Sequence, residues 1–277
     1  MPTTTQSAGT FLKTWKQQVN PFAKALMPVF QKQRQRLVQR FRDLTKARAV
    51  LEPTDAALLY PHDFMADVMQ VGNQQIQKGM AVGAKSELSN VRRLSKRALT
   101  LPLEVQERIS DAVDEQFGQR FWEDKFGNQT RKRIANVLFM SVQKGWTLQE
   151  TAAFLMQDRF GIFTKERALR IARTETTAAL GGGAWIARQE AIAEGAIIGE
   201  EWNAILDSRT RNMHKFADGQ VTARDALGLW YVRDRNGNIL ADGPEFVLGN
   251  ERARYPGDPN LSAENRVNCR CAANAVV

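Results

Sequence analysis

The chain has 277 residues, which is enough for one large domain or two domains of ordinary size. Hydrophobic residues make up 43% and charged residues 25% of it, a composition that is typical of globular proteins and excludes a wholly disordered chain. No run of 18 apolar residues is present and the N-terminus lacks the apolar stretch of a secretory signal, so we expect neither a transmembrane helix nor a membrane partner.

The formal net charge is +9, and all of it belongs to the first 48 residues, which hold ten basic residues and one acidic residue. A segment with such an excess of positive charge is typical of one that binds a polyanion, either nucleic acid or an acidic protein surface. The alternative is a solvated helix face without a partner. The side chains expected to face phosphates are Lys32, Arg34, Arg36, Arg40 and Arg42.

Apolar residues recur at helical spacing from about residue 24 to residue 51, which predicts a long basic amphipathic helix with Pro28 in its first turns. The first ten residues are small and polar, and we expect them to be disordered. Further helices are predicted after Pro61, after Pro102, over 129–145 and from about residue 165.

Two local signals mark where helices begin and pack. The segment 147–150, TLQE, has the pattern of a capping box at a helix N-terminus. The run Gly181–Gly183 lacks the Lys-Ser/Thr of a phosphate-binding loop and follows no predicted strand. It therefore indicates a hinge or a close approach of two helices.

After Gly195 the sequence pattern changes from helical to extended. Alternating residues flank Asn236-Gly237, which is a strong hairpin signal, and glycine and proline become frequent. We therefore predict an α+β fold, with a mostly helical, elongated N-terminal region followed by a small α+β module. The predicted division is a basic arm and amphipathic helix over 1–52, a helical domain over 53–195 and the α+β module over 196–277.

Four short sequences follow one another in the second half of the chain: ARTE at 172–175, GEEWNAILDSRTRNMHKFADG at 199–219, YPGDP at 255–259 and NCRC at 268–271. In this order they resemble the Mu F-like family, the minor head or head morphogenesis proteins of tailed phages. The resemblance covers about residues 165–273. The region upstream resembles the family only in being helical and carries none of these motifs. The residues that carry the motifs, apart from the metal candidates below, are Arg173, Glu175, Trp202, Arg209, Arg211, Asp218, Asp258 and Asn268.

The resemblance implies a minor capsid protein of a phage or prophage, present in the interior of the capsid after assembly in the host cytoplasm. It implies association with the portal protein and a role in head assembly, DNA packaging or ejection. Scaffold and major capsid proteins are further candidate partners. The basic helix would bind double-stranded DNA without sequence preference, through phosphate contacts. Some relatives carry a toxin or enzyme domain after this module, and we expect none here.

The only two cysteines, Cys269 and Cys271, lie in the NCRC segment. Neighbours in a C-x-C sequence are poorly placed to bond to each other, so we expect a reducing compartment with the thiols free or bound to a metal. Together with Asp207 and His214 they form a candidate four-ligand zinc set. The alternative is structural: the cysteines would be small core residues, Asp207 would pair with neighbouring arginines, and His214 would be a hydrogen-bonded core group.

An enzymatic interpretation uses the same residues. Cys269 with His214 would be a nucleophile and its base, or His214 with Asp207 and Asp218 would serve a metal-dependent nuclease. A metal-dependent hydrolase using Asp207, His214, Cys269 and Cys271 is thus the alternative function. The chain has only two histidines and no Gly-x-Ser-x-Gly signature, so we expect a protein that is not an enzyme.

Overall fold

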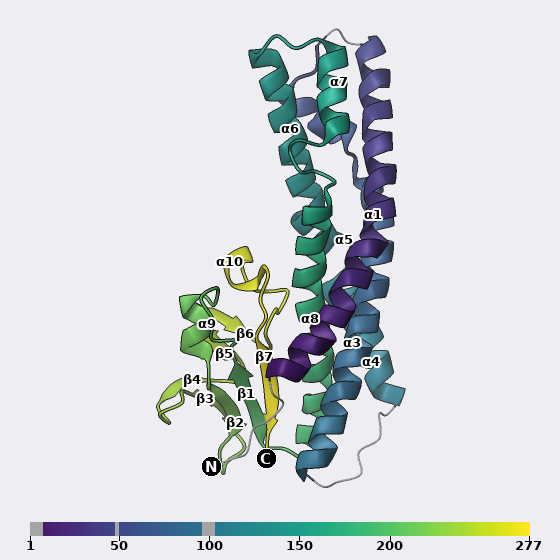
Figure 1. Ribbon diagram of the computed structural model, residues 1–277. Helices are drawn as coiled ribbons and strands as arrows, with labels where there is room; N and C mark the ends of the chain where they lie inside the picture. The colour runs from purple at the N-terminus through teal and green to yellow at the C-terminus, as the bar shows by residue number, and fades with distance from the viewer. Residues whose placement is uncertain (1–7, 48–49, 96–102) are drawn as a thin grey trace. The chain divides into compact units, whose positions relative to one another are not determined.

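The computed structural model describes residues 8–47, 50–95 and 103–277 (Figure 1). They form two compact units, each assembled from separate parts of the sequence. The sheet unit takes residues 1–20, 75–113 and 172–277, and the helical unit takes residues 21–74 and 114–171. The units therefore interleave along the chain, whereas the sequence suggested three consecutive segments.

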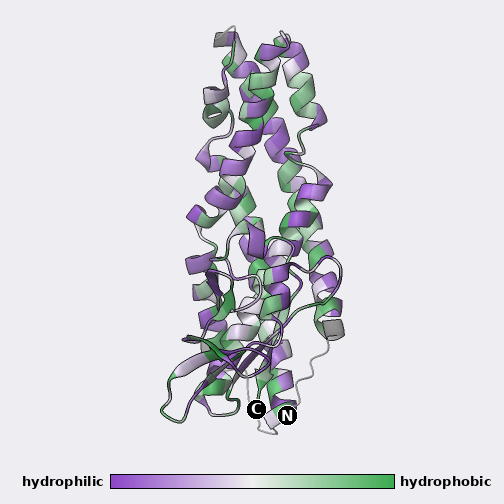
Figure 2. Cartoon of the chain, turned by 90° about the vertical axis from the view of Figure 1, so that its left-hand side faces the viewer, coloured by the Kyte–Doolittle hydropathy of each residue, from purple (hydrophilic) through white to green (hydrophobic). Residues whose placement is uncertain are grey.

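The helices follow one another through both units as α1 (Ala8–Ala47), α2 (Ala56–Leu59), α3 (Met65–Ser95), α4 (Leu103–Gln116), α5 (Gln119–Trp122), α6 (Asn128–Gln143), α7 (Leu148–Gln157), α8 (Lys165–Ala193), α9 (Asn212–Ala217) and α10 (Ala263–Arg266). Single turns of 3₁₀ helix at Pro53–Asp55 and His62–Phe64 and a π-helical turn at Glu123–Gly127 connect some of them. Hydrophilic and hydrophobic residues alternate along these helices, as amphipathic packing requires (Figure 2). Within the described ranges, no helix combines the length and the apolar character needed to cross a membrane.

Helix α1 begins earlier than the sequence pattern predicted. It starts at Ala8 and ends at Ala47, so the predicted start near residue 24 was wrong, and so was disorder for residues 8–10. Residues 1–7 lie outside the described part of the chain. The physical reason is that the buried stripe continues toward the N-terminus through Trp15, Val19 and Phe22, past the two internal prolines.

The helical unit has an apolar and aromatic core. Phe30 of α1 is fully buried, with its ring 5.5 Å from that of Phe126 and 5.9 Å from that of Phe163. Tyr60 is also fully buried, and its ring lies 6.2 Å from that of Phe163. At the start of α7, Thr147 and Glu150 form the predicted capping box.

The sheet unit contains the strands β1 (Gly199–Asn203), β2 (Val221–Arg224), β3 (Trp230–Arg233), β4 (Ile239–Asp242), β5 (Phe246–Leu248), β6 (Glu251–Ala253) and β7 (Ala272–Val276). Five of them form one antiparallel sheet in the order β4-β3-β2-β1-β7, and β5 pairs with β6. The predicted hairpin at Asn236-Gly237 is confirmed as β3 and β4, with Gly237 at φ 91°. Long helices together with this C-terminal sheet confirm the α+β class.

Glycines allow α8 to pack closely within the sheet unit. A Cβ atom at Gly183 would overlap the backbone carbonyl of Met80 on α3, and one at Gly181 would lie 2.7 Å from the carbonyl oxygen of Pro256. The helix continues through Gly181–Gly183 to Ala193. The close approach of elements is therefore confirmed for this run, and the hinge alternative is wrong.

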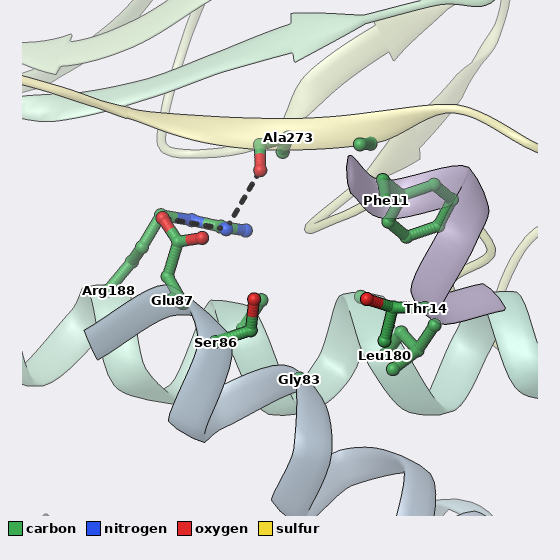
Figure 3. A pocket seen from close by; sticks show the side chains of 11 residues that line it. Phe11, Thr14, Gly83, Ser86, Glu87, Leu180, Arg188 and Ala273 are labelled. Carbon is green, nitrogen blue, oxygen red and sulfur yellow. Dashed lines mark hydrogen bonds and ion pairs between the residues drawn. The ribbon is translucent and has the colours of Figure 1, made fainter. Parts of the chain in front are cut away.

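A buried ion cluster joins α3, α8 and the sheet. Arg188 of α8 donates to Glu200 of β1 at 2.7 Å and to the carbonyl of Ala273 of β7 at 3.0 Å. Glu87 of α3 lies 3.5 Å from the same guanidinium, beside a small cavity of about 30 Å³ (Figure 3). Burial raises the pKa of both Glu87 and Glu200. Since a buried charge is costly unless it is paired, this cluster fixes the position of the sheet against the two helices.

Candidate functional site

The NCRC segment and helix α9 bring one imidazole and two thiols together. His214 is buried on α9, and its Nδ1 lies 3.2 Å from Sγ of Cys271 and 3.6 Å from Sγ of Cys269. These three atoms all lie within 4.8 Å of one another. Neither thiol forms a disulfide.

Core packing holds the three side chains in place. The indole of Trp202 on β1 meets the His214 ring edge to face at 5.9 Å and the Phe246 ring at 5.3 Å. Trp202 and both cysteines belong to the same buried cluster as Phe246. The cysteines are therefore part of the buried core of the module.

Asp207 does not join this group. Its carboxylate accepts two hydrogen bonds from the guanidinium of Arg270, at 2.8 and 2.9 Å, and one from the amide of Arg209 at 2.9 Å. The bidentate bond from Arg270 holds the pKa of Asp207 well below its usual value. Arg270 was missed by the sequence reasoning, although its position between the two cysteines, on the opposite face of an extended segment, was a usable signal.

The predicted arginine cluster around Asp207 is only partly formed. Arg209 lies 3.6 Å from Asp207, with a side chain that is 75% exposed. Arg211 instead donates a hydrogen bond to the carbonyl of Val267, just before the NCRC segment. The two arginines therefore bind different parts of the module.

The ARTE sequence of α8 anchors the NCRC segment. Glu175 forms a buried ion pair with Arg266. The amide of Asn268, a residue with a left-handed φ of 55°, donates to the hydroxyl of Thr174 at 3.2 Å. Thr177 follows two residues after Glu175 and donates to the carbonyl of Cys269 at 2.6 Å. Arg173, the remaining motif residue, is exposed.

The other motif carboxylates stabilise turns. Asp258, in the YPGDP sequence, accepts two hydrogen bonds from the guanidinium of Arg254, at 2.9 and 3.0 Å, and one from the backbone amide of Asn260 at 3.0 Å. Asp218 accepts from the amide of Ala204 at 2.8 Å and from Arg235 at 2.5 Å. Each therefore has partners of its own, separate from the His214 cluster.

The coupled thiols differ in acidity. A hydrogen bond from Cys271, followed by one from His214, lowers the pKa of Cys269 well below that of an ordinary thiol. The pKa of Cys271 is raised in turn, through the same hydrogen bond and through burial. Chemically, the cluster offers two sulfur atoms and one ring nitrogen as donors.

The predicted phosphate-facing residues lie on α1, in the helical unit. Lys32 and Arg36 both pair with Asp67, at 3.0 and 3.1 Å, and their side chains are 53% and 44% exposed. Arg40 donates to the carbonyl of Leu58 and Arg34 to that of Met156. Arg42 is exposed. The basic residues are thus partly paired with protein groups, and Arg34 lies on a different side of α1 from Lys32 and Arg36.

Comparison with known proteins decides the family. The sequence profile of the family described as "Phage Mu protein F like protein" matches residues 132–274, more than half of the chain. The chain belongs to this family. The match confirms the resemblance drawn from the motifs, and membership of the family indicates a phage head morphogenesis protein of the virion.

One relative among the curated proteins has a different description. It is the NAD(+)--arginine ADP-ribosyltransferase EFV of Enterococcus faecalis (strain ATCC 700802 / V583), with 24% identity over 185 residues. The match covers 65% of this chain and 33% of the relative, so the chain spans about a third of that protein's length. No solved structure matches the chain.

Proposed function

We propose that this Mu F-like protein is a minor head protein of the capsid interior, bound to the portal, and that it acts in assembly, packaging or ejection by binding rather than by catalysis. The observation that carries the proposal is the use of the motif residues. Glu175, Asp207, Asp218 and Asp258 are each bonded to an arginine of the same unit. Residues engaged in this way maintain a docking module rather than supply an acid or a base to a substrate.

A second part of the proposal concerns DNA. The basic face of α1 keeps a positive balance, because Lys32 and Arg36 share one carboxylate and Arg40 and Arg42 have no acidic partner among the described residues. Phosphate contacts do not depend on base sequence, which suits a protein that meets whatever DNA is packaged. We propose that this face neutralises DNA phosphates inside the head.

The test is the salt dependence of binding to double-stranded DNA. Deleting the first 48 residues is not a clean experiment, since Phe30, Leu37 and Phe41 of α1 are buried in the helical unit. The triple variant Arg36→Gln/Arg40→Gln/Arg42→Gln instead removes three exposed charges and leaves the apolar face intact. For the unaltered protein, we expect a plot of log binding constant against log salt concentration to have a slope of about −4 to −5. For the variant, we expect the slope to be less steep by about 2 to 3.

The matched control is Lys132→Gln/Lys144→Gln/Lys165→Gln, which removes three exposed charges of the same unit from other elements. An equal loss of binding in both variants would assign the effect to net charge and not to the face of α1. Absence of binding at low salt would overturn the DNA part of the proposal. The partner of the basic face would then be an acidic protein surface.

The head and portal parts need separate measurements. Mass spectrometry of purified phage heads should find the protein in a few copies per head, and co-purification should recover it with the portal. Its absence from heads would contradict the proposal. Nuclease or hydrolase activity that disappears in His214→Ala, while the protein stays folded, would replace the binding role by the enzymatic alternative.

A further inference from the structure

We infer that His214, Cys269 and Cys271 form a zinc site with three protein ligands and a fourth position for solvent. This site is separate from the proposed DNA-binding face and does not depend on it. It also differs from the ligand set suggested by the sequence, because Asp207 is replaced by solvent as the fourth ligand.

The spacing of the three donor atoms fits a tetrahedral zinc ion. With zinc–sulfur and zinc–nitrogen bonds of ordinary length, a sulfur and a nitrogen on the same ion are about 3.5 Å apart. Nδ1 of His214 lies 3.2 Å from one sulfur and 3.6 Å from the other. An ion placed among the three atoms would require only small side-chain adjustments.

Hydrogen bonding alone accounts less well for the approach of two sulfur atoms to one ring nitrogen. Nδ1 of an imidazole carries either one proton or one lone pair, so it can form one good hydrogen bond in its ring plane. Here Cys269 and Cys271 both approach that single nitrogen. An ion among the three atoms would bind all of them at once.

The chemistry of the donors selects the metal. Two thiolates and an imidazole are the ligands that zinc prefers, and they disfavour magnesium and calcium, which take oxygen ligands. Two thiolates also balance the charge of a divalent ion. The nearby guanidinium of Arg270 is paired with Asp207, whereas Arg211 is bonded to a backbone carbonyl and keeps its charge.

A small cavity supplies the fourth position. It has a volume of about 20 Å³ and is lined by the three proposed ligands together with Thr210, Asn268 and other residues of the two loops. A space of this size accommodates one water molecule. Zinc sites with three protein ligands keep such a position open, whereas purely structural sites usually have four.

Metal binding would connect two parts of the module that are distant in sequence. His214 lies on α9, and the cysteines lie immediately before β7, the strand that pairs with β1. Zinc would hold this strand against α9 while the fourth position stays open to solvent.

The experiment measures metal content and cobalt spectra of the full chain. We expect about one zinc ion per chain after purification with zinc and dialysis, and cobalt substitution should give a thiolate-to-cobalt charge-transfer band with intense tetrahedral ligand-field bands. His214→Gln, Cys269→Ser and Cys271→Ser should each lose the ion. Circular dichroism shows whether each variant is folded.

The matched control is Asp207→Asn, which should keep both the zinc content and the cobalt spectrum. Loss of the metal in this variant, with the fold retained, would overturn the three-ligand assignment. Failure of the unaltered protein to bind zinc or to give a thiolate–cobalt band would overturn the site altogether, and that result does not depend on the folding of any variant.

Discussion

The helical unit and the sheet unit bury their arginines against different partners, uncharged oxygens and a ring in the first and carboxylates in the second. In the helical unit, Phe30 contacts the rings of Phe126 and Phe163, and the buried guanidinium of Arg167 lies over the Phe126 ring and donates to uncharged oxygens. In the sheet unit, buried polar groups join segments that are far apart in sequence. Arg188 binds Glu200 and the backbone of β7, and Arg266 binds Glu175.

The difference has a physical consequence for mutation. Hydrophobic burial has no direction, so an apolar core tolerates replacement by another apolar residue of similar volume. A buried ion pair depends on both partners, because removal of one leaves the other charge without compensation. We therefore expect the sheet unit to be the more sensitive of the two to single substitutions at its buried polar positions.

The largest effect is expected from Arg188→Met in the sheet unit. The guanidinium is fully buried between Glu87 and Glu200, and its loss leaves two buried carboxylates. We expect unfolding to require about 3–5 kcal/mol less free energy, measured by urea denaturation with circular dichroism. The triple variant Arg188→Met/Glu87→Gln/Glu200→Gln should recover much of this loss, and no recovery would show that packing rather than charge is responsible.

A smaller effect is expected from Phe30→Leu in the helical unit. The replacement keeps an apolar side chain at a fully buried position and loses the aromatic contacts with Phe126 and Phe163. We expect a loss of about 1–2 kcal/mol in the same denaturation experiment. If Phe30→Leu lowered the free energy of unfolding as much as Arg188→Met does, the expected difference in sensitivity between the two units would be wrong.

The smallest effect is expected from Asp207→Asn, and it depends on pH. In the folded protein, Arg270 lowers the pKa of Asp207 below its ordinary value of 3.8. The charged carboxylate therefore stabilises the fold fully at pH values above 3.8. The stabilisation is lost as pH falls through the lower pKa of the folded state. The melting temperature of the variant should therefore be below that of the unaltered protein at pH 7, and the difference should shrink progressively as pH falls below about 4. A difference that is constant with pH would contradict the ion-pair role.

Local patterns in the sequence predicted the elements that depend on short-range order. The helices after Pro61 and Pro102, the capping box at Thr147 and the hairpin at Asn236-Gly237 all rest on residues within one or two turns of each other. The start of α1 was predicted incorrectly, because two internal prolines obscured a buried stripe that continues toward the N-terminus. The ordered motifs of residues 172–271 were also sufficient to place the chain in the Mu F-like family.

The sequence by itself therefore determined the α+β class, the main helices, the family and the four candidate residues at the site. Only the tertiary structure decided how those four are divided, with Asp207 bonded to Arg270 and His214 placed beside Cys269 and Cys271. It also decided that parts distant in sequence share one unit. The reason is that a carboxylate has several possible arginine partners along this chain, and only the folded backbone brings one guanidinium within hydrogen-bonding distance of both of its oxygens.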